Sequence, residues 1–82
     1  MKHTEAIKSI MKRTGLTQVE VAASLGLRSR ATVSMRINRE RAWLHNIVEI
    51  LDVMGYEMVA MPKEDYRSIP EDAYVLRRED YK

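Results

Sequence analysis

The 82-residue chain contains no cysteine, no phenylalanine and only one tryptophan, and it has just three glycines and two prolines. Without cysteine it can form neither disulfide bonds nor thiolate metal sites, and we expect it in a reducing compartment. No apolar run approaches the ~20 residues of a membrane span, and the N-terminus lacks the hydrophobic region of a signal peptide. These absences predict a soluble, cytoplasmic protein that makes no contact with membranes.

Residues that carry catalysis are also scarce. The sequence has no histidine–acid pair at a useful spacing, no glycine-rich phosphate loop and no cluster of metal ligands. The two histidines, His3 and His45, stand far apart, and both are expected to be surface residues. We therefore expect a protein that is not an enzyme and that holds no metal or cofactor.

The length of the chain and the distribution of its charges limit the possible classes of function further. A chain of 82 residues supplies one hydrophobic core, which is marginal alone and often depends on a partner subunit. The net charge is only +2, but residues 28–41 hold five arginines and one acid, Glu40, whereas acids slightly outnumber bases after Lys63. This concentration of positive charge favours phosphate binding, and a solvated charged surface is the alternative.

The stretch Leu16–Arg39 organises the rest of the chain and is predicted to form two short helices joined by a tight turn. The first is expected over residues 17–25, because Thr17 can cap its N-terminus and Glu20 can complete a capping box. Gly26 would end this helix, since glycine adopts a left-handed backbone at little cost. Its buried stripe is expected to consist of Val21, Ala22 and Leu25.

The second helix of this stretch is predicted to begin at Arg28 or Ser29 and to run to about Asn38. Val33 and Ile37 stand four residues apart, so they share its buried face. Short helices joined by a glycine-containing turn, with the second helix presented at the surface, are typical of a helix-turn-helix motif.

The pattern T-Q-x-x-x-A-x-x-x-G-[L/V] resembles the helix-turn-helix of the Cro/cI (Xre) family of repressors, and it is formed here by Thr17, Gln18, Ala22, Gly26 and Leu27. The family usually places an aliphatic core residue six positions after the glycine, where this chain has Thr32 and the aliphatic residue follows as Val33. We interpret the shift as a turn that is longer by about one residue, which leaves a one-residue ambiguity in the register of the recognition helix.

This resemblance covers roughly the first two-thirds of the chain and implies both a fold and a function. The expected fold is mainly α, a four-helix lambda-repressor-like helix-turn-helix domain with a short C-terminal β-hairpin. The implied function is sequence-specific binding of double-stranded DNA by a dimeric transcriptional regulator, a repressor of phage or mobile-element type. The recognition helix, at about residues 29–38, would enter the major groove.

Two further helices are expected on either side of the motif. Lys2–Thr14 has an apolar stripe at helical spacing and ends at Gly15, and a longer helix is expected over Trp43–Met54, ended by Gly55. The second of these is apolar over more than half its circumference, so it must bury two sides. One side can cover the core, and the other needs the C-terminal segment or a second subunit.

The C-terminal third of the chain has a different sequence pattern from the rest. Tyr56–Met61 and Ala73–Arg77 are predicted to be strands, with Pro62–Asp72 as the loop of a long hairpin. Residues 1–55 would then be the DNA-binding domain, and 56–82 an appendage that is a candidate dimerisation element. A mobile tail over Glu64–Lys82 is the alternative.

In the docking that this motif uses, the first residues of the second helix meet base edges. Arg28 and Arg30 lie at that entry, where an arginine can bond O6 and N7 of guanine together. With Val33 and Ile37 turned inward, the predicted base-contacting set is Arg28, Ser29, Arg30, Ala31, Thr32, Ser34, Met35 and Asn38.

A second set is predicted to contact DNA phosphates. By resemblance to the family, Gln18 binds a phosphate at the positive end of its helix, and long arginine side chains farther along would reach others. The predicted phosphate-contacting set is Thr17, Gln18, Arg36, Arg39 and Arg41. A two-fold homodimer would present two such surfaces to half-sites about 34 Å apart.

Two other functions, protein binding and RNA binding, are alternatives to the repressor hypothesis. An antitoxin-type interaction module would use the acidic, proline-containing C-terminal segment to bind a protein partner, and a disordered tail would favour it. RNA binding lacks support, because phenylalanine is absent and the tyrosines cluster late, which leaves no aromatic stacking platform.

Overall fold

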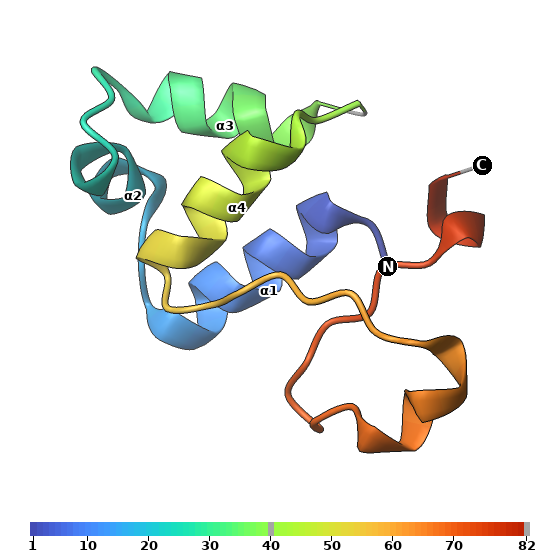
Figure 1. Ribbon diagram of the computed structural model, residues 1–82. Coiled ribbons are helices and arrows are strands. Elements are labelled where there is room, and N and C mark those ends of the chain that lie inside the picture. The colour runs from blue at the N-terminus through green and yellow to red at the C-terminus, as the bar shows by residue number, and fades with distance from the viewer. Residues whose placement is uncertain (40, 82) are drawn as a thin grey trace.

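The computed structural model describes residues 1–39 and 41–81, and the side chains of residues 65–67 are outside the description. Four α-helices make up its body: α1 (His3–Thr14), α2 (Gln18–Ser24), α3 (Arg30–Asn38) and α4 (Leu44–Val53). An extended C-terminal segment follows, with two short 3-10 helices, η1 (Lys63–Ser68) and η2 (Arg78–Tyr81) (Figure 1). Glu40 and Lys82, which belong to the predicted loop and appendage, lie outside the described residues. No described helix has both the length and the apolar character needed to cross a membrane.

The ends of α2 follow the local signals in the sequence. Thr17 Oγ1 accepts a hydrogen bond from the Glu20 N–H at 3.2 Å, and Glu20 Oε1 accepts one from the Thr17 N–H at 3.2 Å. The predicted capping box is therefore confirmed. Gly26 follows with φ +70°, which lets the Leu27 N–H donate to the Ala22 carbonyl at 2.8 Å and satisfies one of the last carbonyls of the helix.

The hydrophobic core lies between the four helices, with α3 packed against α1, α2 and α4 (Figure 1). Val33 and Ile37 of α3 are both 0% exposed, as their four-residue spacing predicted. The other buried core side chains are Ile7, Ile10, Val21, Ala22, Ile47, Ile50 and Met54. This set supports a small, mainly helical domain.

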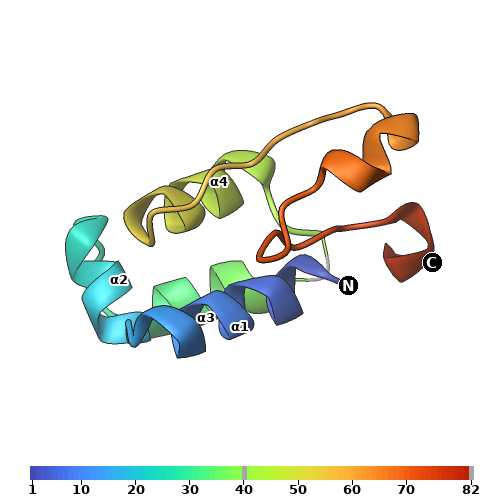
Figure 2. The same cartoon turned by 90° about the horizontal axis from the view of Figure 1, so that it is seen from below.

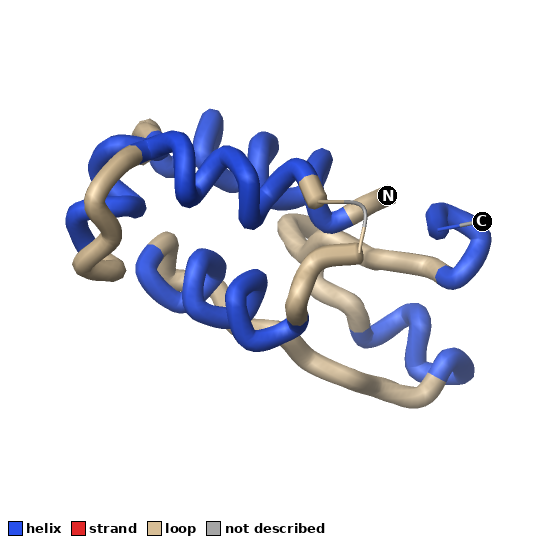
Figure 3. The backbone as a smooth tube through the Cα atoms, turned by 90° about the horizontal axis from the view of Figure 1, so that it is seen from above, coloured by secondary structure: helices blue, strands red, loops and turns tan. Residues whose placement is uncertain are grey.

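The predicted C-terminal hairpin was wrong. Residues 56–61 and 73–77 are extended but form no strand within the described part of the chain, and the backbone tube is free of strand there (Figure 3). An isolated two-stranded hairpin is marginally stable at best, and here the segment is anchored by side chains instead. Tyr56 and Tyr74 pack against the core with ring centroids 6.3 Å apart, and the Arg13 guanidinium lies 5.9 Å from the Tyr74 ring centroid.

The C-terminal segment brings the two ends of the chain together. After α4 it runs back toward the start of α1, and the chain leading into η2 passes beside the N-terminus (Figures 1 and 2). The Met1 ammonium contacts the Val75 carbonyl at 3.1 Å and the Asp80 carboxylate at 2.5 Å. The Asp80 pKa is lowered, first by this ammonium and then by a hydrogen bond from the Arg77 N–H.

The outer side of α4 is only partly covered. Ile47 and Ile50 face the core, whereas Leu44 is 65% exposed and Trp43 and Val48 are exposed beside it. The helix was expected to bury two sides, and in the single chain only one of them is buried while the other remains open to solvent.

Candidate nucleic-acid interface

The face of α3 opposite its buried residues is open to solvent. Ala31, Met35 and Asn38 recur at helical spacing on this face, and Met35 is 56% exposed. Because Val33 and Ile37 fill the core on the other side, the orientation of α3 is fixed by packing. This face of α3 is therefore exposed on the surface of the single chain.

Positive charge gathers at the N-terminal end of α3. Arg28, Ser29 and Arg30 are all exposed there, and α3 begins at Arg30, one to two residues later than predicted. Ser29 is the N-cap residue, but its side chain makes no capping hydrogen bond. The Ser29 side chain thus occupies none of the first N–H groups of α3, and the positive end of the helix dipole adds to the two guanidinium charges.

The polar residues of the outer face are joined to one another. The Asn38 side-chain amide donates to the Ser34 carbonyl at 2.8 Å and to the Ser34 hydroxyl at 3.1 Å. These bonds hold the Asn38 amide in one orientation, so its carbonyl oxygen remains available to an outside donor. Ser34 and Thr32 are half-buried and flank the exposed stripe.

Arg36 is placed differently from the other predicted contact residues. Its side chain turns toward α4, where Nη1 lies 3.7 Å from a Glu49 carboxylate oxygen. This nitrogen is buried and has no hydrogen-bond partner among the described residues. The residue lines a hollow of about 210 Å³ between α3 and α4, together with Thr32, Met35, Arg39, Trp43 and Asn46.

Arg39 and Arg41 are exposed in the loop that follows α3. Arg39 ends the helix, and its N–H donates to the Met35 carbonyl at 3.2 Å. The two arginines line different hollows, because Arg41 borders one of about 260 Å³ formed by the start of α4 and the C-terminal segment. The loop therefore spreads its charge over two sides.

Thr17 and Gln18 lie at the start of α2, on a different helix from the predicted base-contacting residues. The Thr17 hydroxyl already serves the capping box, and Gln18 is half-buried. The other predicted contact residues follow one another along α3 and its flanking turns. Thr17 and Gln18 lie apart from them in the sequence, at the N-terminus of α2.

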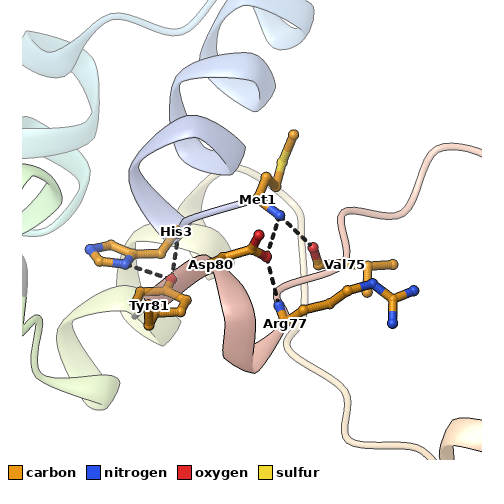
Figure 4. Close-up of polar contacts among 6 residues, drawn as sticks. All are labelled: Met1, His3, Val75, Arg77, Asp80 and Tyr81. Carbon is orange, nitrogen blue, oxygen red and sulfur yellow. Dashed lines mark hydrogen bonds and ion pairs between the residues drawn. The ribbon is translucent and has the colours of Figure 1, made fainter.

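His3 is a residue whose placement the sequence prediction got wrong. It is 6% exposed, and its Nδ1 lies 2.8 Å from the Tyr81 hydroxyl (Figure 4). Its Nε2 lies 3.0 Å from the Arg39 carbonyl. Its partner Tyr81 lies at the far end of the chain, so no local pattern could reveal the contact. His45, in contrast, is exposed as predicted and lies edge-on to Trp43.

Comparisons with known proteins find no counterpart of this arrangement. No family model, no curated protein and no solved structure matches the chain. Function is therefore inferred from the placement of the residues themselves.

Proposed function

We propose that this protein is a sequence-specific double-stranded DNA-binding regulator, a transcriptional repressor that acts as a dimer. In this proposal α2 and α3 form a helix-turn-helix motif of the Cro/cI type, and α3 is the recognition helix. The observation that carries it is the division of α3 into two faces. Val33 and Ile37 are completely buried, while the opposite face and the arginine-bearing N-terminal end are uncovered.

The dimensions and chemistry of DNA suit this surface. The major groove, about 12 Å wide, admits an α-helix, and residues near the N-terminus of that helix meet the base edges. Arg28 and Arg30 would pair with guanine O6 and N7, and Ala31 and Met35 would contact thymine methyl groups. Asn38 would complete the base-contacting stripe with its free carbonyl oxygen.

Phosphate contacts would position the helix in the groove. Arg39 and Arg41 are exposed beyond the end of α3, and Gln18 lies at the positive end of α2. Arg36 would have to give up its approach to Glu49 to reach a phosphate, so Arg39 and Arg41 are the stronger donors of this set.

The direct test is selection of bound sequences from a random duplex pool at low ionic strength. We expect enrichment of a site with two-fold symmetry, because a homodimer presents two copies of α3 to half-sites about 34 Å apart. Uniform recovery of all sequences would reject specific recognition, and failure to retain any duplex would reject nucleic-acid binding altogether.

Replacing Arg39 with alanine should weaken binding to the selected duplex and to a scrambled duplex by similar factors. A phosphate contact carries no sequence information, and its loss should flatten the dependence of log affinity on log salt by about one charge. Fluorescence anisotropy across a salt series measures both quantities. Lys63→Ala serves as the control, because it removes a positive charge outside the arginine-rich stretch; an equal change of slope in both variants would contradict the assignment.

We further expect the protein to sediment as a dimer at micromolar concentration. Leu44 and Val48 of α4 are apolar and exposed, and so are Met58 and Val59 of the C-terminal segment. Leu44 and Met58 line the same hollow. Val48→Glu should raise the dissociation constant at least about tenfold by placing a charge in the buried interface. The same change at exposed Val19 of α2 is the matched control, and a monomeric wild-type protein in sedimentation velocity would remove the dimer from the proposal.

A further inference from the structure

The C-terminal end of α3 is completed by side chains from α1. The last carbonyls of a helix have no partners within it. Here the Thr4 hydroxyl donates to the Ile37 carbonyl at 2.9 Å, and His3 Nε2 lies 3.0 Å from the Arg39 carbonyl. Since a carbonyl oxygen only accepts, Nε2 must carry the proton that makes this bond.

In the neutral ring, that bond also sets the roles of the other polar atoms around His3. In the neutral ring with a proton on Nε2, Nδ1 is an acceptor, so the Tyr81 hydroxyl donates to it across 2.8 Å. The same hydroxyl accepts from the His3 backbone N–H at 2.6 Å. The two rings stack with an interplanar angle of 3° and centroids 5.7 Å apart. Each polar atom of the pair has a defined role.

The network joins the C-terminal segment to the arginine-bearing loop. Tyr81 belongs to η2, which Asp80 holds in place through the Met1 ammonium and the Arg77 N–H (Figure 4). Arg39 ends α3, and Arg41 lines the same hollow as His3 and Tyr81. A displacement of η2 would therefore reach the Arg39 carbonyl through the His3 ring.

We propose that His3 and Tyr81 are positioning residues through which the C-terminal segment holds the loop of Arg39 and Arg41 in the geometry for phosphate contact. This inference rests on the proposed DNA binding. It assigns the C-terminal segment a role in each subunit separately, besides any contribution to a dimer. It also makes the segment a point at which DNA affinity can be adjusted without any change in the residues that touch DNA.

The first arm of the test uses the free, full-length protein. Tyr81→Phe removes both hydrogen bonds to His3 and keeps the stacked ring, and Tyr74→Phe is the control because its hydroxyl bonds to no described residue. We expect amide hydrogen exchange at Arg39 to become about five times faster in Tyr81→Phe only, the factor that corresponds to one net hydrogen bond. Unchanged exchange in Tyr81→Phe would overturn the coupling.

Substitutions at His3 separate positioning from general stability. His3→Gln retains a donor in the place of Nε2 and should preserve slow exchange at Arg39, whereas His3→Leu should lose it. If both variants show the same exchange at Arg39, or if the effect simply follows the melting temperature of each variant, the role is structural and the proposal fails.

The second arm measures DNA affinity in a salt series. Tyr81→Phe should bind selected and scrambled duplexes about fivefold more weakly with a flatter salt dependence, as loss of a phosphate contact requires. Altered exchange with unaltered affinity would overturn the link to phosphate contact. If the wild-type protein itself ignores DNA, the proposed function fails, and the exchange arm still decides whether η2 is coupled to the loop.

Discussion

Replacing Ile37 with alanine is expected to lower the free energy of unfolding by about 2–5 kcal/mol. Ile37 is 0% exposed and belongs to the core cluster to which all four helices contribute. The loss combines the transfer free energy of the deleted atoms with the cavity left behind, because the surrounding helices relax only partly. A small domain has a total stability of only about 5–15 kcal/mol, so a large part of it depends on this one side chain.

Urea denaturation followed by circular dichroism measures this loss. Met35→Ala is the matched control, since it shortens an apolar side chain two residues away on the exposed face of the same helix. We expect that variant to differ from wild type by no more than about 0.5 kcal/mol. Similar losses in the two variants would mean that α3 does not present one face to the core and the other to solvent.

Replacing Arg30 with alanine should cost about 1–3 kcal/mol of binding free energy on the selected duplex, and much less on a scrambled one. Arg30 is exposed at the N-terminal end of α3, and it takes part in no ion pair among the described residues. Its guanidinium is therefore free to bond two acceptors of one guanine, an interaction that a wrong base cannot replace.

Parallel titrations of the two duplexes separate this role from simple charge. Arg39→Ala provides the comparison, because a phosphate-contacting residue should weaken both duplexes alike. If Arg30→Ala also weakens both by the same factor, Arg30 supplies charge only, and the base-contacting set must begin elsewhere on α3.

Local interactions explain why the helical part of the chain could be predicted. The capping box of Thr17 and Glu20 spans three residues, and the buried pair Val33 and Ile37 is one helical turn apart. Such signals involve residues within about one helical turn, so they can be recognised in the sequence before any tertiary contact is known. The helices accordingly begin and end within a residue or two of their predicted limits.

The C-terminal segment shows the opposite case. Strand-forming residues at 56–61 and 73–77 predicted a hairpin, yet both segments remain extended without strand pairing in the described chain. Strand propensity measures how well a residue fits a pleated, half-buried surface, and a lone pair of strands provides little of that. The anchoring contacts of Tyr56, Tyr74 and Tyr81 with distant parts of the chain prevail instead.

By itself, the sequence determined the four helices, the glycine-ended turns and the face of α3 that enters the core, because periodicity and capping are properties of neighbouring residues. Only the tertiary structure decided that His3 is buried, that Arg36 turns toward Glu49 and that the chain ends meet beside the loop after α3. These contacts join residues far apart in the sequence. They form only after the packing of the helices has brought the two partners close together, so no local pattern in the sequence specifies them.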